Sequence, residues 1–172
     1  RDAVRQAIAA GADIIDIGGV KAGPGDVVDV DEEIRRTVPF VAAVREEFPD
    51  TLLSIDTWRA EVGRHCADAG ADIINDTWAG SDPALGDVAA EFGCGYVCSH
   101  TGGAVPRTRP HRVHYDDVVR DVIDQTSRAA ADLDARGVPR AGILIDPTHD
   151  FGKNTWHGLE LLRRVDELVA TG

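Results

Sequence analysis

A six-residue segment that occurs twice, letter for letter, constrains the fold of this chain more than any other feature. Residues 10–15 and 69–74 both read Ala-Gly-Ala-Asp-Ile-Ile and lie about 59 positions apart, roughly twice the ~30-residue length of a βαβ unit. In each copy an Ala-rich helix end precedes a glycine, which favours a left-handed C-terminal cap, and β-branched residues typical of a strand follow. The repeat therefore predicts successive βα units.

Five short, nearly continuous apolar runs are predicted as strands, with helical patterns between them. The predicted strands are 13–17, 52–56, 72–76, 96–100 and 143–146, and the predicted helices are 32–47, 59–69, 83–92, 115–135 and 156–169. The first ten residues read as the back half of a further helix. Apolar runs of this kind are typical of a parallel sheet covered by helices. Strict alternation with short connections indicates an α/β fold, either a closed barrel or a doubly wound sheet.

The placement of polar residues favours the barrel. Every predicted strand ends at or near a polar side chain, namely Asp16, Asp56, Asn75 with Asp76, His100 and Asp146. Several parallel strands that contribute polar groups at their carboxyl ends are typical of a TIM-barrel active-site face. A dinucleotide-binding sheet would instead show G-x-G-x-x-G after its first strand, and residues 18–23 do not match that pattern. We therefore expect a TIM-type (β/α)8 barrel, represented here by about five consecutive βα units.

Charge and cysteine content exclude several classes of function. Eighteen basic and thirty acidic side chains give a net charge of -12, which argues against a nucleic-acid partner. No run of eighteen apolar residues and no signal-peptide pattern is present, so we expect no membrane partner and a cytoplasmic location. Cys66, Cys94 and Cys98 are predicted to be reduced, buried thiols. Cys94, Cys98 and His100 lack a second ligand pair, so the sequence assigns no metal site.

Four motifs, in order and at matching spacing, resemble the dihydropteroate synthase family across essentially the whole chain. They are Gly-Ala-Asp-Ile-Ile-Asp-Ile-Gly-Gly at 11–19, Ser-Ile-Asp-Thr at 54–57, Gly-Ala-Asp-Ile-Ile-Asn-Asp at 70–76, and Asp-Pro at 146–147 followed by Phe-Gly-Lys at 151–153. The resemblance implies that Asp56, Asn75 and Asp146 bind a pterin deep in the barrel. The aminopyrimidinone edge of a pterin offers both donors and acceptors, which carboxylates and an amide can match.

The resemblance also carries expectations for the whole protein. It implies a transferase of folate biosynthesis that condenses hydroxymethyl-dihydropterin pyrophosphate with p-aminobenzoate, aided by Mg2+ whose ligand lies outside this segment, in a homodimer. It further implies that residues 1–172 form one pterin-binding barrel domain that lacks the first strand and the last two βα units.

Two loops depart from the family pattern. Where the family has Glu-Ser-Thr-Arg-Pro-Gly, residues 20–25 read Val-Lys-Ala-Gly-Pro-Gly, so that Ala22 and Gly23 replace the Thr and the Arg and only Lys21 offers a charge. Residues 148–150, Thr-His-Asp, replace a glycine-rich turn. These departures keep a second hypothesis open beside the synthase: a divergent pterin-binding paralogue with weak or no synthase activity, acting as a binding or assembly module.

Several polar residues are explained as well by structural roles as by functional ones. Asp16 and Asp76 are predicted to cap neighbouring backbone N–H groups. His100 is expected to pack on one strand face rather than to act in catalysis, and Lys153 is expected to be a solvated loop charge. The basic stretch 107–112 either attracts an anionic substrate or is a solvated loop, and the sequence does not separate these alternatives.

Overall fold

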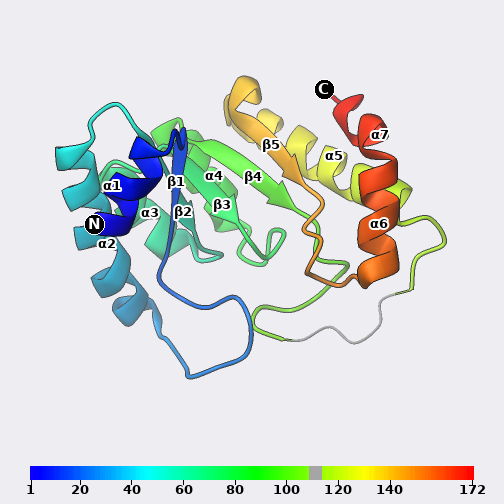
Figure 1. Ribbon diagram of the computed structural model, residues 1–172, viewed down its shortest axis with the longest axis horizontal. Coiled ribbons are helices and arrows are strands. Elements are labelled where there is room, and N and C mark those ends of the chain that lie inside the picture. The colour runs from blue at the N-terminus through cyan, green and yellow to red at the C-terminus, as the bar shows by residue number, and fades with distance from the viewer. Residues whose placement is uncertain (109–113) are drawn as a thin grey trace.

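The computed structural model describes residues 1–108 and 114–172, and its centre is one five-stranded parallel sheet with the strand order β1-β2-β3-β4-β5 (Figure 1). The strands are β1 (Ile14–Gly18), β2 (Leu52–Asp56), β3 (Ile73–Asp76), β4 (Gly95–Ser99) and β5 (Ile143–Asp146). The α-helices are α1 (Asp2–Ala9), α2 (Val30–Glu47), α3 (Ala60–Asp68), α4 (Ala84–Phe92), α5 (Val118–Arg136), α6 (Thr155–Arg163) and α7 (Val165–Val169), and a short 3-10 helix spans Arg140–Gly142. Each strand thus pairs with its neighbour in sequence, as expected for consecutive βα units of a barrel.

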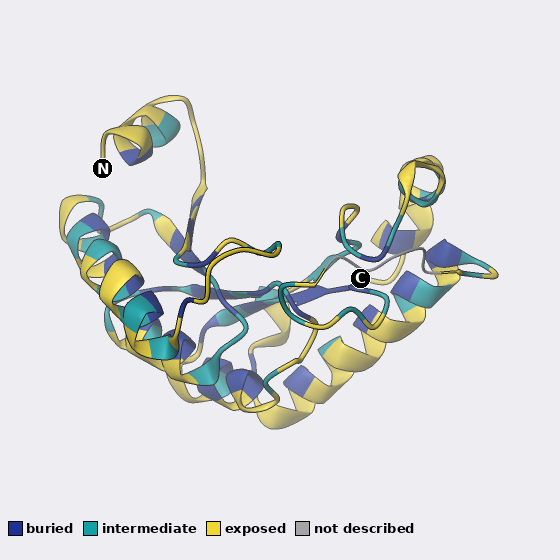
Figure 2. Cartoon of the chain, turned by 90° about the horizontal axis from the view of Figure 1, so that it is seen from below, coloured by how far each residue is buried: buried dark blue, intermediate teal, exposed yellow. Residues whose placement is uncertain are grey.

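Alternation along the strands gives the sheet two different faces. On β1, Ile15 and Ile17 are buried against the helices, whereas Ile14 and Asp16 are exposed on the opposite face, because successive side chains of a strand point to opposite sides. Figure 2 shows the long helices running along one side of the sheet, with the N-terminal helix apart from them. The other side, which is the inner face of the barrel arc, carries Asp16, Asn75 and Asp146.

The predicted strands agree with the observed ones to within one residue at each end, and the glycines of the repeat behave as expected. Gly11 and Gly70 have φ values of 93° and 109°, in the left-handed region that glycine adopts without steric cost. Each therefore ends a helix and redirects the chain into the following strand.

Two predicted helices differ most from the structure. Helix α5 starts at Val118 rather than at residue 115, because the Asp117 carboxylate accepts hydrogen bonds from the backbone N–H groups of Val119 and Arg120 and acts as the N-cap. The single helix predicted for 156–169 is two helices, α6 and α7, which meet at Arg164. The guanidinium of Arg164 is bonded to Asp117, the N-cap of α5, and to Glu167 on α7, so a tertiary contact coincides with the break.

The three cysteines are free and buried. Burial raises the pKa of the Cys66 thiol to about 11 and that of Cys98 to about 12, so both stay protonated and unreactive at neutral pH. No helix within residues 1–108 and 114–172 is long and apolar enough to cross a membrane.

Candidate functional site

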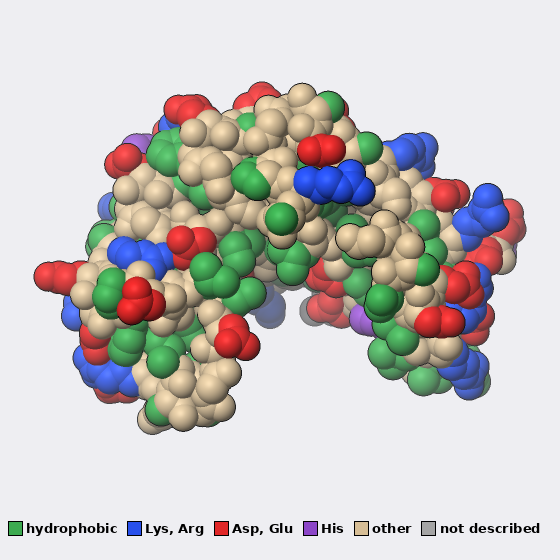
Figure 3. All heavy atoms as spheres, turned by 90° about the horizontal axis from the view of Figure 1, so that it is seen from above, with side chains coloured by type: hydrophobic (Ala, Val, Ile, Leu, Met, Phe, Trp, Pro, Cys, Tyr) green, Lys and Arg blue, Asp and Glu red, His purple; other side chains and the backbone are tan. Residues whose placement is uncertain are grey.

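The strand register brings the predicted pterin-binding residues to the inner face of the sheet. Asp56 pairs with Asn75 across β2 and β3, and Asp146 pairs with Ser99 across β4 and β5. An open cavity of about 410 Å³ on this face is lined by Asn75, Asp146 and Asp16 together with apolar strand residues. Figure 3 shows the molecule hollowed between two protrusions, with hydrophobic and acidic side chains at the margin of the hollow.

Asp16 takes a different place from the one expected. Its carboxylate oxygens accept hydrogen bonds of 3.3 and 3.4 Å from the Asn75 Nδ2, and within the described residues no backbone N–H donates to it. The predicted capping role is therefore wrong for Asp16, which is instead a cavity residue. An Asn whose amide is held in this way keeps its carbonyl oxygen available as an acceptor.

Asp56 lies on the same face but is not among the residues that line this cavity. Its carboxylate accepts a hydrogen bond from the Thr77 hydroxyl and lies close to Gly18, where an added Cβ would be 3.3 Å from Asp56 Oδ2. Burial raises the pKa of Asp56 to about 6, and the neighbouring charge of Asp16 contributes in the same direction. A partly buried carboxyl group with a raised pKa is a feature of functional sites.

Asp146 is fixed by the altered turn that follows it. Its Oδ1 accepts a 2.7 Å hydrogen bond from the backbone N–H of Thr148, and Thr148 adopts a φ of 48°, a left-handed conformation that a β-branched residue rarely takes. The Thr148 hydroxyl in turn accepts from the backbone N–H of His100 at 3.2 Å. The turn thus joins the ends of β4 and β5.

Lys153 is not the solvated loop charge that the sequence predicted. Its Nζ donates to the backbone oxygens of His100, Thr148 and Phe151 at 2.8, 3.1 and 3.0 Å. Burial lowers the pKa of Lys153 to about 8. The prediction is wrong because the ammonium group meets three carbonyl groups brought together by two loops, and sequence spacing does not reveal such a cluster.

The altered loop after β1 borders a second cavity, of about 340 Å³. Lys21, Ala22 and Gly23 line it from one side, and residues 150–153 and Trp78 line it from the other. Lys21 is exposed, and neither Ala22 nor Gly23 offers a polar side chain. This wall therefore presents backbone and an exposed point charge rather than a fixed hydroxyl and guanidinium.

A buried ion pair anchors both ends of this loop. Glu33, fully buried, accepts hydrogen bonds from the Thr57 hydroxyl at 2.7 Å and from Arg59 at 2.6 Å, and Arg59 also donates to the carbonyl of Val28 at 2.8 Å. A Cβ on Gly19 would lie 3.0 Å from Glu33 Cγ and 2.8 Å from a Thr37 methyl carbon, so only glycine fits there. The loop is therefore held against the end of β2, next to Asp56.

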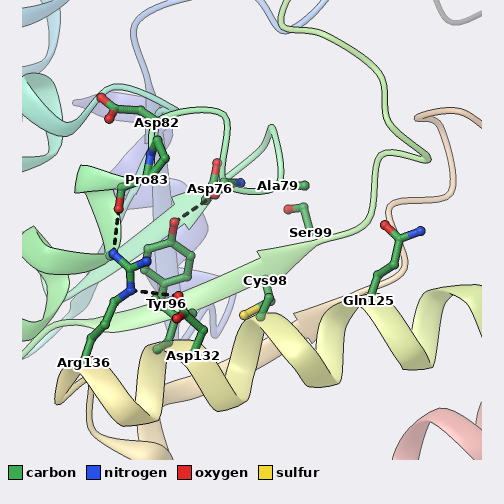
Figure 4. A pocket seen from close by; sticks show the side chains of 14 residues that line it. Asp76, Ala79, Asp82, Pro83, Tyr96, Cys98, Ser99, Gln125, Asp132 and Arg136 are labelled. Atoms are coloured by element: carbon green, nitrogen blue, oxygen red, sulfur yellow. Dashed lines mark hydrogen bonds and ion pairs between the residues drawn. The ribbon is translucent and has the colours of Figure 1, made fainter.

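His100 and Asp76 serve the opposite, helix-covered face of the sheet. The His100 Nε2 lies 2.8 Å from Asp121 Oδ2 on α5, and burial lowers the pKa of His100, which agrees with the expected packing role. Asp76 accepts hydrogen bonds from the backbone of Trp78 and Gly80 and from the Tyr96 hydroxyl, so its predicted capping role is confirmed. Figure 4 shows Asp76 and Tyr96 in a separate pocket against α5, away from the inner face.

The basic stretch 107–112 is only partly described. Residues 109–112 lie outside the described residues, whereas Arg107 donates a 2.7 Å hydrogen bond to the carbonyl of Asp26.

Among residues 1–108 and 114–172, no group of three or more His, Cys, Asp or Glu side chains is arranged to hold a metal ion. The described residues thus provide no set of ligands to which Mg2+ can be assigned.

Sequence reasoning missed Trp78, which is 2% exposed and packs edge-to-face on Phe151 with a ring-centroid distance of 4.7 Å. The available signal was a large aromatic residue two positions after a strand-end Asp, on a loop where small polar residues are the usual choice.

Comparison with known proteins places these features in one family. A family described as "Pterin binding enzyme" matches residues 1–172. The chain is 62% identical over 176 residues to the "Inactive dihydropteroate synthase 2" of Mycobacterium leprae, covering 100% of this chain and 60% of that protein. The chain therefore spans less than two thirds of the length of this relative.

Solved structures agree with this assignment. The structure of Mycobacterium tuberculosis Rv1207 has a TM-score of 0.83 at 54% identity, covering 100% of this chain and 66% of that one. Dihydropteroate synthase from Thermus thermophilus in complex with 4-aminobenzoate has a TM-score of 0.90 at 34% identity, covering 99% of this chain and 64% of that one. The five βα units thus correspond to part of a dihydropteroate synthase TIM barrel, as the polar strand ends predicted, and the chain belongs to the pterin-binding enzyme family.

Proposed function

We propose that this chain is the pterin-binding part of a divergent dihydropteroate synthase paralogue that binds a pterin and has weak or no synthase activity. Asn75 and Asp146 contact the pterin in the inner-face cavity, and Asp16 holds the Asn75 amide. Asp56 hydrogen-bonds to the pterin ring from the end of the adjacent strand. The observation that carries the proposal is the convergence of these groups on one face. Carboxylates and an amide together match a heterocycle edge that both donates and accepts hydrogen bonds.

The weak or absent synthase activity follows from the side chains that the altered loop offers to the second cavity. Departure of pyrophosphate requires cationic groups that absorb the developing charge, and a guanidinium would clamp an anionic oxygen through two parallel N–H bonds. Gly23 has no side chain, and Lys21 is exposed. Similarity to a relative described as inactive supports the same proposal.

Calorimetry with 6-hydroxymethylpterin on the full-length protein tests pterin binding. Replacing Asp146 by Ala leaves donors of the bound ring without an acceptor, at a cost of about 1 to 3 kcal/mol for each buried group. We therefore expect Asp146→Ala to weaken pterin binding at least about fivefold. Asp124→Ala, a change on the exposed surface of α5, is the matched control and is expected to keep the parent affinity. Equal affinity of the parent and Asp146→Ala would rule the assignment out.

The proposal extends to the whole protein. Residues 1–172 are one incomplete barrel domain, and the first strand and the last two βα units come from sequence outside it. The protein is a cytoplasmic homodimer with no nucleic-acid or membrane partner. If the synthase reaction is retained, the enzyme is a transferase of folate biosynthesis that uses Mg2+, held by a residue outside this segment. Size measurement by light scattering tests the dimer.

A further inference from the structure

A strained turn follows β5 directly. Pro147, the residue after Asp146, has a fixed φ and no backbone N–H, so the first backbone donor beyond Asp146 is that of Thr148. Thr148 has a φ of 48°, and its N–H donates a 2.7 Å hydrogen bond to Asp146 Oδ1. This conformation costs a glycine nothing, whereas a β-branched residue keeps it only when its surroundings hold it there. The contacts of Thr148 therefore decide whether the turn persists.

The Thr148 hydroxyl joins the ends of two strands. It accepts a 3.2 Å hydrogen bond from the backbone N–H of His100, the residue after β4, and donates a 3.1 Å hydrogen bond to the backbone carbonyl of Asp146. The His100 N–H also donates to that carbonyl at 3.1 Å. Thr148 is only 7% exposed, and buried hydrogen bonds that satisfy one another in this way fix the groups that they join. The hydroxyl thus stabilises the left-handed conformation.

Lys153 restrains the same turn. Its Nζ donates to the backbone carbonyls of His100 and Thr148 at 2.8 and 3.1 Å, so the two residues that the hydroxyl connects are also connected through one ammonium group. A change of φ at Thr148 would therefore disturb hydrogen bonds to His100, Asp146 and Lys153.

The turn bears on the inner-face cavity through Asp146. Asp146 lines that cavity together with Asp16 and Asn75. Within residues 1–108 and 114–172, the bond from the Thr148 N–H is the one hydrogen bond that the Asp146 carboxylate makes. A carboxylate anchored through one oxygen keeps its orientation and retains acceptor sites for a ligand. The orientation of the Asp146 carboxylate therefore depends on the backbone conformation of Thr148.

We propose that Thr148 is a positioning residue of the pterin site: its hydroxyl holds the left-handed turn whose N–H orients the Asp146 carboxylate for the ligand. This inference rests on the proposed function. Glycine, the residue type of this turn in the family, adopts a positive φ without strain. In this chain the hydroxyl makes the same backbone conformation accessible to a threonine.

Calorimetry with 6-hydroxymethylpterin on full-length variants separates positioning from packing. Thr148→Val keeps the shape of the side chain and removes the hydroxyl, and we expect it to weaken pterin binding about two- to tenfold. Thr148→Ser, which keeps the hydroxyl, and Thr148→Gly, which removes the strain, are expected to retain the parent affinity. A packing role predicts the reverse order, because glycine deletes the most side-chain atoms and leaves the largest cavity.

Hydrogen exchange of the backbone amide at position 148 tests the turn without a ligand. Its protection factor should fall about two- to tenfold in Thr148→Val, fall also in Asp146→Ala, which removes the acceptor, and persist in Thr148→Ser and Thr148→Gly. Thr148→Ala lacks the hydroxyl in a smaller side chain; it should follow Thr148→Val in both measurements and replaces that variant if it does not fold.

Failure of the inference differs from failure of the proposed function. No pterin binding by the parent, or unchanged affinity in Asp146→Ala, would refute the proposed function and this role of Thr148 with it. A loss of affinity in Asp146→Ala combined with parent affinity in Thr148→Val would overturn the inference alone. Weaker binding by Thr148→Gly than by Thr148→Val, or unchanged amide protection in Thr148→Val, would overturn it as well.

Discussion

Replacement of Asp56 by Asn is expected to stabilise the protein at neutral pH and to leave its stability unchanged in acid. Burial raises the pKa of Asp56 from 3.8 to about 6, which means that the folded state prefers the neutral carboxyl group. Asn is neutral at every pH and keeps an oxygen that accepts from the Thr77 hydroxyl. The variant therefore removes the cost of the buried charge and little else.

The size and sign of the effect follow from proton linkage. Below a pH of about 3.8, Asp56 is neutral in both the folded and the unfolded chain and costs nothing. As the pH rises from 3.8 to about 6, the unfolded chain loses this proton before the folded chain does, so the parent loses stability across that window. Each tenfold difference in proton affinity is worth about 1.4 kcal/mol of unfolding free energy. The raised pKa therefore lowers the unfolding free energy of the parent by about 3 kcal/mol above a pH of about 6. Residual solvent access makes this an upper figure.

Urea unfolding of the parent and Asp56→Asn between about pH 4 and about pH 7.5 measures the effect. We expect the two free energies of unfolding to agree near the acidic end and to differ by about 2 to 3 kcal/mol at the upper end. Asp50→Asn, at an exposed turn residue, is the control and should show no such divergence. A difference that does not vary with pH, or a variant less stable than the parent at neutral pH, would refute the reasoning.

Two further predictions concern the altered loop and Lys153. In an assay of dihydropteroate formation with Mg2+ and both substrates, the full-length parent should show weak or no turnover. The Ala22→Thr, Gly23→Arg double variant should gain activity, since a guanidinium can bind an anionic oxygen through two N–H bonds. Robust turnover by the parent would contradict the proposed function. Lys153→Met should lower the free energy of unfolding at neutral pH by about 1 to 3 kcal/mol, because three backbone carbonyls lose their donor, whereas Lys21→Met should have no effect in the same thermal or urea unfolding measurement.

Much of the fold could be predicted from the sequence, because its signals are local. The repeat at 10–15 and 69–74 contains a helix end, a glycine cap and a strand start within six residues, and the φ values of Gly11 and Gly70 match that interpretation. Steric limits on φ and the period of apolar residues act over a few positions. The order of the strands followed from their short connections, and the polar strand ends indicated the barrel face.

Only the tertiary structure decided which polar groups meet. Asp16 and Asn75 are separated by 59 residues, and they meet because β1 and β3 both flank β2 in one parallel sheet. Lys153 is half-buried, and its Nζ is surrounded by three carbonyls from two loops, those after β4 and β5. Trp78, in the loop after β3, packs on Phe151, in the loop after β5. Burial and hydrogen-bond partners depend on long-range packing, which local propensity does not encode.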